Sequence, residues 1–359
     1  MKRTINGIQR VGIGVANAQE AFNWYRKFFG TDVIVFKDAA TASLMKKYTG
    51  NEEHRRLAIL AMNMQSGGGF EIWQFTSRIP QSAGQSLQLG DLGIFAVKIK
   101  SKDVQATYHH YRSNGVTILT EPAKSPAGLE HFFMQDPYRN VFEIVEHNYW
   151  FCNNEHLTGA VCGIIIGVSD INKSVSFYRN ILGYDELVSN ASGVFEDFKN
   201  LKGGSHIFKR VLLGHSRKIS GAFGKLLGPT SIELVEVQDR KTQKIYAERF
   251  WGDLGFIHVC YDINGMDTHE KICFRHGHPL TVNSKNSFDM GDAAGHFSYN
   301  EDPDGSLIEY VETHKVPIIK KLGWYLNIKN RNPENPLPDW IVKCLGFGRV
   351  KEKSKKYIQ

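Results

Sequence analysis

An internal repeat constrains the fold of this chain more than any other feature. The segment from Val11 to Gly30 returns about 153 residues later, from Ile164 to Gly183. Each copy has the pattern of a short apolar strand, a polar turn and an amphipathic helix that ends at a glycine. A unit that occurs twice in one chain predicts a duplicated architecture rather than a single irregular domain.

The two halves continue in the same order after this first motif. A strand with a central glutamate comes first, then a Gly-Asp-Leu-Gly turn, a second strand and helix, and an Asp-Pro turn that leads into another strand with a glutamate. In chain order the two copies of these landmarks are Glu71 and Glu233, Gly90 and Gly252, Asp136 and Asp302, and Glu143 and Glu309. Each half therefore contains two βαβββ units, which gives four in the chain.

Two motifs of the second half carry a family resemblance. The helix motif Phe177-Tyr-Arg-Asn-x-Leu-Gly183 and the ending Asp302-Pro-Asp-Gly-x-x-Ile-Glu309 resemble the vicinal oxygen chelate superfamily, which holds glyoxalases, methylmalonyl-CoA epimerases, extradiol dioxygenases and bleomycin-resistance proteins. The resemblance covers about residues 8–313.

The resemblance implies an α+β fold in which four βαβββ modules pair into two glyoxalase-like domains. In that family two paired units curve their sheets around a cavity, and each pair makes one site. We therefore expect an N-terminal domain at 1–150, a C-terminal domain at 151–315 and a basic tail at 316–359.

The resemblance also implies four ligand positions for each pair of units. When the motifs are matched residue by residue, the C-terminal half supplies Gly163, Glu233, His258 and Glu309. The N-terminal half supplies Arg10, Glu71, Ile94 and Glu143. Only the C-terminal set then combines an imidazole with two carboxylates, so we expect the metal site there and none in the N-terminal domain.

The donor types of the C-terminal set determine the predicted chemistry. One imidazole and two carboxylates suit a divalent ion such as Zn²⁺, Mn²⁺, Fe²⁺, Co²⁺ or Ni²⁺. With His258, Glu309 and Glu233 as ligands, the resemblance implies an isomerase or lyase of the glyoxalase/epimerase type, which removes a proton next to a carbonyl. We expect Glu309 to be the general base, with Glu233 as the other catalytic carboxylate. In the N-terminal set, Arg10 should pair with Glu71 or Glu143, because buried carboxylates require compensation.

Two other functions stay open. Gly163 cannot coordinate a metal through a side chain, whereas the dioxygenases of the superfamily use two histidines and one glutamate. A ring-cleaving or other non-haem metal dioxygenase would therefore need a replacement ligand such as His296. The second alternative is a protein that binds a small molecule without catalysis. Because the chain is rich in Phe, Tyr and Trp, it suits an aromatic or acyl ligand without selecting between them.

The distribution of charge limits the macromolecular partners. The formal net charge is +7, and the segment from Val316 to Gln359 alone holds ten Lys or Arg against three Asp or Glu. The remainder of the chain is therefore neutral, and we expect no nucleic-acid partner. The tail mixes bases with aromatic residues, so it can contact an anionic surface or pack on the body. We expect it to pack, with Trp324 and Trp340 docked on the body.

Cysteine content and hydropathy indicate the compartment. The five cysteines include no Cys-x-x-Cys pair, which argues for reduced thiols and against both a disulfide framework and a cysteine-based zinc site. No apolar run approaches the ~18 residues of a membrane span, and no signal-peptide core follows Met1. We expect a cytoplasmic protein, and a homodimer is compatible with the sequence.

Overall fold

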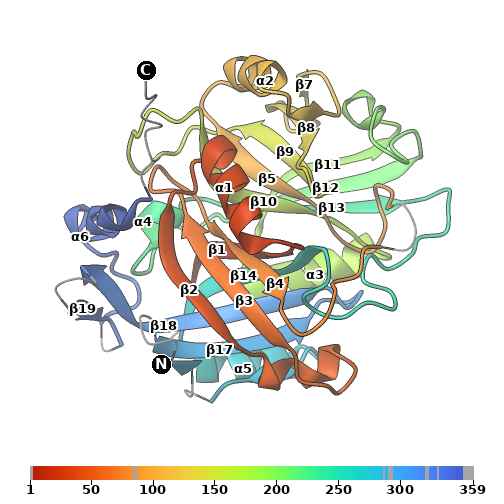
Figure 1. Ribbon diagram of the computed structural model, residues 1–359. Helices are drawn as coiled ribbons and strands as arrows, with labels where there is room; N and C mark the ends of the chain where they lie inside the picture. The colour runs from red at the N-terminus through yellow and green to blue at the C-terminus, as the bar shows by residue number, and fades with distance from the viewer. Residues whose placement is uncertain are drawn as a thin grey trace.

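Two large curved sheets dominate the structure, a computed structural model that describes residues 3–83, 87–285, 288–289, 294–319, 323–329 and 331–350 (Figure 1). In this described part, the first sheet has ten strands and the second has nine. The predicted α+β class and the four βαβββ units are confirmed.

The first sheet is made by the first and fourth units. The first unit consists of β1 (Thr4–Gly14), α1 (Ala18–Phe29), β2 (Val33–Thr41), a 3₁₀ helix (Ser43–Tyr48), β3 (Arg55–Met62) and β4 (Gly69–Phe75). The fourth unit consists of β14 (Gly255–Asn264), α5 (Met266–Arg275), β15 (Val282–Asn283), β16 (Phe288–Asp289), β17 (Ala294–Glu301) and β18 (Leu307–Ile319).

The second sheet is made by the second and third units. The second unit consists of β5 (Gly93–Ser101), α2 (Val104–Ser113), β6 (Thr117–Ile118), β7 (Ala123–Lys124), β8 (Glu130–Gln135) and β9 (Val141–Glu146). The third unit consists of β10 (Thr158–Gly167), α3 (Ile171–Leu182), β11 (Glu186–Gly193), a 3₁₀ helix (Glu196–Phe198), β12 (Phe208–Gly214), α4 (Gly224–Leu227) and β13 (Ser231–Val237).

The order of the strands corrects the expected pairing of the units. The first sheet runs β15-β17-β18-β14-β1-β4-β3-β2, with β1 antiparallel to β14. The second runs β11-β12-β13-β10-β5-β9-β8-β6, with β10 antiparallel to β5. The expected boundary at residue 150 therefore falls inside the second sheet. The opening strands of the units share one apolar pattern, so local sequence does not decide which of them pair.

Hydrogen bonds from two helices connect different pairs of units from those that share a sheet. The hydroxyl of Tyr25, on α1, donates a hydrogen bond to Asp136 of the second unit at 2.7 Å. In the same way Tyr178, on α3, donates to Asp302 of the fourth unit at 3.1 Å. These are the tyrosines of the repeated helix and the aspartates of the repeated Asp-Pro turns. The sheets thus join the first unit to the fourth, whereas these contacts join the first to the second and the third to the fourth.

The two repeated helices begin and end as the sequence predicts. The side chains of Asn17 and Asp170 accept hydrogen bonds from the first free backbone N–H groups of α1 and α3. Both helices stop at a glycine in the left-handed conformation, Gly30 with φ 61° and Gly183 with φ 76°.

The C-terminal segment packs on the first sheet. It adds β19 (Trp324–Asn327) beside β18, and then α6 (Asp339–Cys344) and a 3₁₀ helix (Leu345–Gly348). Ile328, Leu337 and Val342 are buried. Docking of this segment is confirmed, but the expected anchors are wrong: Trp324 and Trp340 are exposed and lie against each other. Among the described residues, no helix has the length and apolarity to span a membrane.

Candidate metal centre

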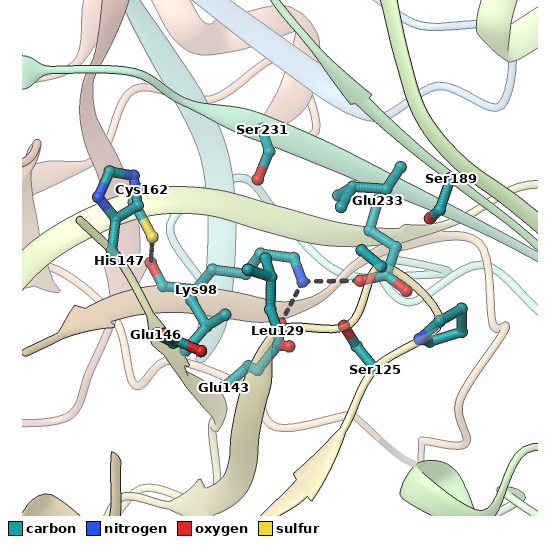
Figure 2. A pocket seen from close by; sticks show the side chains of 14 residues that line it. Lys98, Ser125, Leu129, Glu143, Glu146, His147, Cys162, Ser189, Ser231 and Glu233 are labelled. Carbon is teal, nitrogen blue, oxygen red and sulfur yellow. Dashed lines mark hydrogen bonds and ion pairs between the residues drawn. The ribbon is translucent and has the colours of Figure 1, made fainter. Parts of the chain in front are cut away.

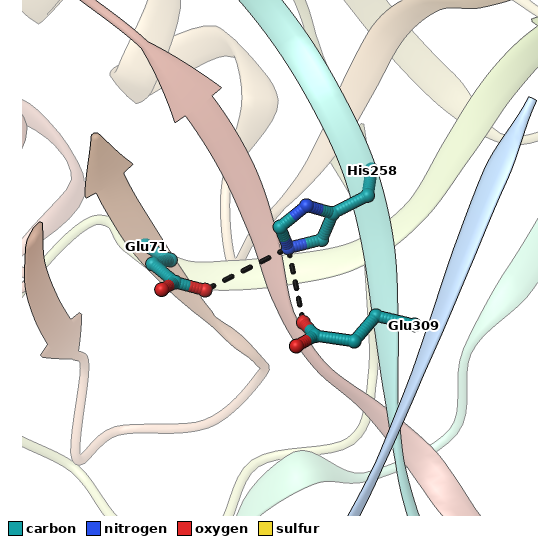
Figure 3. A group of neighbouring side chains, drawn as sticks. All are labelled: Glu71, His258 and Glu309. Atoms are coloured by element: carbon teal, nitrogen blue, oxygen red, sulfur yellow. Dashed lines mark ion pairs between the residues drawn. The ribbon is translucent and has the colours of Figure 1, made fainter. Parts of the chain in front are cut away.

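Three side chains of the first sheet converge on its concave face. Glu71 comes from β4, His258 from β14 and Glu309 from β18, and they point toward one another (Figure 3). His258 Nε2 lies 3.1 Å from Glu309 Oε2 and 3.7 Å from Glu71 Oε2. One potential ligand atom from each residue lies within 4.8 Å of the others, and all three residues are buried. The first and fourth units therefore build this group together.

Arg10, on β1, forms ion pairs with both carboxylates of this group. Its Nε donates to Glu71 Oε2 at 2.7 Å, and its terminal NH2 nitrogen lies 2.9 Å from Glu309 Oε2. The expected pairing of Arg10 with a buried carboxylate is confirmed for Glu71. Its second partner is Glu309, because Glu143 belongs to the other sheet.

Burial and charge act against each other on these groups. Burial favours the neutral form of Glu71, but the positive charges of Arg10 and His258 outweigh it and hold the Glu71 pKa well below its usual range. Burial likewise disfavours the charged form of His258, but Glu309 and Glu71 outweigh that effect and raise the pKa of the imidazole. The site thus keeps Glu71 ionised.

Aromatic side chains fix the imidazole and line the way to the carboxylates. The ring of Trp251 lies parallel to His258, with a centroid distance of 6.2 Å, and Tyr299 meets the imidazole edge-on at 5.5 Å. A cavity of about 250 Å³ reaches Arg10 and the two glutamates. Its aromatic walls are formed by Trp73, Trp251, Phe297 and Tyr299.

In the second sheet an ammonium group stands between the corresponding carboxylates (Figure 2). Lys98, on β5, donates to Glu143 and, at 2.7 Å, to Glu233 Oε2. Arg210 Nε donates to Glu233 Oε1 at 2.8 Å. His131 Nδ1 lies 2.6 Å from Glu143 Oε1. All these side chains are buried.

Asp197 completes this buried network. It accepts two hydrogen bonds from Arg210 at 2.9 and 2.8 Å and lies 3.2 Å from His131 Nε2. Three basic and three acidic side chains therefore balance one another if His131 is protonated. Sequence reasoning missed Lys98, His131 and Arg210, although the two lysines of the strand from Gly93, Lys98 and Lys100, stand among apolar residues and were a signal for Lys98.

The structure separates the predicted ligand set. His258 and Glu309 lie together, but Glu233 lies in the other sheet, so the expected triad of His258, Glu309 and Glu233 is wrong. Glu71, which had been assigned to a half without metal, takes that place. The cause is the pairing of units, because β14, which carries His258, pairs with β1 of the first unit and not with β10 of the third.

Three other predicted positions also change. In the strand register, Lys98 lies opposite Glu143 and Cys260 lies opposite Glu309. His258 stands two residues before Cys260, so its counterpart in the second sheet is Ala96, two residues before Lys98, and not Ile94. A Cβ atom at Gly163 would lie 2.5 Å from the Ser231 carbonyl oxygen, so the backbone itself occupies that place. Phe297 and Tyr299 line the cavity, so the alternation of the strand turns His296 to the opposite face. There His296 lies 2.7 Å from Asn283 Oδ1 and is not a replacement ligand.

The two curved sheets, built from four βαβββ units, have the arrangement of a vicinal oxygen chelate fold. Residues 7–144 match the sequence model of the Glyoxalase/Bleomycin resistance protein/Dioxygenase superfamily. No curated protein sequence matches the chain.

Solved structures of similar fold span most of the chain. Glyoxalase I from Zea mays has 15% identity and a TM-score of 0.54 over 87% of this chain and 92% of its own. A protein from Bacillus subtilis subsp. subtilis str. 168, named a putative dioxygenase, has 15% identity and a TM-score of 0.57 over 98% of each chain. At this identity the likeness concerns the fold alone.

Proposed function

We propose that this protein is a metal-dependent isomerase or lyase of the glyoxalase/epimerase type, with its site at Glu71, His258 and Glu309. The observation that carries the proposal is one imidazole nitrogen and two carboxylate oxygens within 4.8 Å of one another on a concave sheet face. That donor set suits a divalent ion with remaining positions open to water or substrate. The proposed site is shared by the first and fourth units.

The unsatisfied atoms of the site fit such an ion. His258 Nε2 is buried and makes no aligned hydrogen bond; Glu309 Oε2 lies 3.1 Å from it and is ion-paired with Arg10 at 2.9 Å without an aligned hydrogen bond. Buried polar atoms without an aligned partner are costly, and a shared cation would satisfy both. Arg10 would weaken the binding of this ion, because its guanidinium already neutralises the two carboxylates.

The proposed reaction removes a proton from the carbon next to a carbonyl. A divalent ion at this site would supply Lewis-acid polarisation of the carbonyl oxygen. Glu309 is the proposed base: its carboxylate lines the cavity and would hold the proton at one oxygen before returning it to the product. Arg10 orients Glu71 and Glu309 and keeps Glu71 ionised. The aromatic walls would exclude water from the reacting carbon, and they favour an aromatic or acyl substrate.

A second candidate function is binding of a small molecule without catalysis. The observation that favours it is the ion pairing of Arg10 with both glutamates, which balances their charge with no added ion. In that case the cavity of about 250 Å³ would hold a ligand next to Arg10 and the two glutamates, which are already paired with one another.

Elemental analysis of protein purified without chelators separates the two functions. We expect one divalent ion per chain, lost in His258→Ala and in Glu71→Gln. Glu233→Gln is the matched control, since it changes the corresponding glutamate of the second sheet and should leave the ion in place. Wild-type protein without stoichiometric metal would favour the binding function. Oxygen consumption with catechols would instead identify a dioxygenase.

A further inference from the structure

The outer face of the C-terminal segment exposes large aromatic side chains. Trp340 is 59% exposed, Phe347 73% and Trp324 40%. The rings of Trp324 and Trp340 lie 6.4 Å apart at an angle of 29°, so strand β19 and helix α6 contribute to one patch. Clustered exposed apolar groups mark interaction surfaces, whereas scattered ones need no explanation.

A basic side chain lies within the same patch. Lys343 is exposed and follows Trp340 by three residues and precedes Phe347 by four, on α6 and the 3₁₀ helix that continues it. On α6, Trp340 and Lys343 therefore share one side of the helix. The carboxylate next to Trp340 in the sequence, Asp339, is neutralised by Lys225 at 2.7 Å.

Most of the surface of Trp340 and Phe347 is exposed, so these two rings do not anchor the segment to the body. The segment is fixed by its inner face, where Leu337 and Val342 are buried and the Leu337 N–H donates to the Ala222 carbonyl at 3.0 Å. At its end, the Val350 N–H donates to the Asp32 carbonyl at 2.9 Å. The patch therefore lies on the outer side of a segment that is packed on the body, and its exposed aromatic groups can contact a partner.

The sequence concentrates positive charge at this end of the chain. Beyond Val350, nine residues include Lys351, Lys353, Lys355 and Lys356 against Glu352 alone. Because residues 1–315 carry no net charge, an anionic surface would attract the C-terminal segment in preference to the rest of the chain.

We infer that this face, formed by Trp324, Trp340 and Lys343, binds the surface of an anionic lipid bilayer with the help of the terminal lysines. Tryptophan rings settle at the boundary between lipid headgroups and acyl chains, and lysines near an anionic leaflet add attraction that depends on salt. Nucleic acid is a poorer match, because the two tryptophan rings lie against each other instead of standing open to bases. This role goes beyond the proposed reaction and does not depend on it.

Sedimentation with vesicles tests the inference on the full-length protein. Phosphatidylcholine vesicles with about one third phosphatidylserine should carry the protein into the pellet, and pure phosphatidylcholine vesicles should not. The joint variant Lys351→Gln, Lys353→Gln, Lys355→Gln and Lys356→Gln should weaken binding more than about hundredfold, since each lysine near the surface contributes about fivefold. Trp324→Ala with Trp340→Ala should weaken it about tenfold, with at most a small drop in melting temperature from the lost contact between the two rings.

Phe274→Ala is the matched control, because Phe274 is an equally exposed aromatic residue on α5, outside the patch. It should bind anionic vesicles as the wild type does. The inference is overturned if the wild type binds neither vesicle, if it binds both equally, or if the lysine and tryptophan variants bind as tightly as the wild type. Preference for duplex DNA or single-stranded RNA over the anionic vesicles would also overturn it.

Discussion

Gly12 and His258 face each other across β1 and β14, and the imidazole occupies the space that a side chain at position 12 would need. A Cβ atom added to Gly12 would lie 2.4 Å from His258 Cε1 and 2.7 Å from its Nε2. The glycine of the first unit therefore sets the position of the only imidazole in the proposed metal centre. This contact exists only because the first unit pairs with the fourth.

Gly12→Ala should displace the imidazole and lower both metal affinity and stability. The double variant Gly12→Ala with His258→Ala should recover much of the lost stability, because the clash disappears with the ring. Chemical denaturation of the wild type, both single variants and the double variant measures this coupling. Additive losses would show that the methyl group and the ring do not meet.

Arg10→Gln should increase the affinity for divalent ions on the order of tenfold or more. The substitution removes a positive charge that lies 2.7 Å from Glu71 and 2.9 Å from Glu309, and it supplies an amide oxygen instead. Titration of chelator-treated protein with Mn²⁺ or Zn²⁺ measures the change. Weaker binding in the variant would mean that Arg10 supports the ion instead of opposing it.

Glu309→Gln and Glu143→Gln should separate the two sheets functionally. Loss of the proposed base should reduce turnover at least about hundredfold, and it should also cost stability, because Arg10 and His258 lose a buried partner. Glu143→Gln should leave turnover intact but cost about 3 kcal/mol of stability, because Lys98 and His131 lose a buried partner. The partner that loses its charge balance is Lys98, not Arg10 as the sequence suggested. Equal loss of turnover in both variants would place chemistry in the second sheet as well.

The stability of the second sheet should fall between neutral and alkaline pH. Burial disfavours charged His131, but Asp197 and Glu143 outweigh burial and raise its pKa from 6.5 to about 9. A raised pKa means that the stabilisation is complete below about pH 6.5 and is lost as the pH rises through about 9. A pKa difference of one unit corresponds to about 1.4 kcal/mol. Urea unfolding at several pH values should show this decline, and His131→Gln should remove it; the same decline in both proteins would assign it to another group.

Deletion of the residues after Lys315 should lower solubility and heat stability without abolishing metal binding. The deletion uncovers the apolar surface on which Ile328, Leu337 and Val342 pack, whereas none of the residues of the metal centre is removed. Thermal melting and metal analysis of the shortened protein measure the two effects. If heat stability were unchanged, the buried contacts of the segment would contribute nothing to the fold.

Most of the local structure could be predicted from the sequence. The repeat, its capped helices and its Asp-Pro turns depend on spacing within a few residues, and they identified the four units and the α+β class. The glutamates within the strands and His258 were recognisable for the same reason. Arg10 was recognisable as a partner of Glu71 or Glu143, since buried carboxylates require compensation.

The association of the units was decided only by the tertiary structure. The strands that begin at Thr4 and Thr158 are both almost fully buried and share an apolar second half, and either could serve beside β14 or β5. Contacts between residues far apart in the sequence distinguish the two pairings. Gly12 leaves space for His258, and the ammonium group of Lys98 lies between Glu143 and Glu233. Such contacts join residues more than a hundred positions apart, so no local pattern encodes them. They determine that Glu71, rather than Glu233, completes the group around His258.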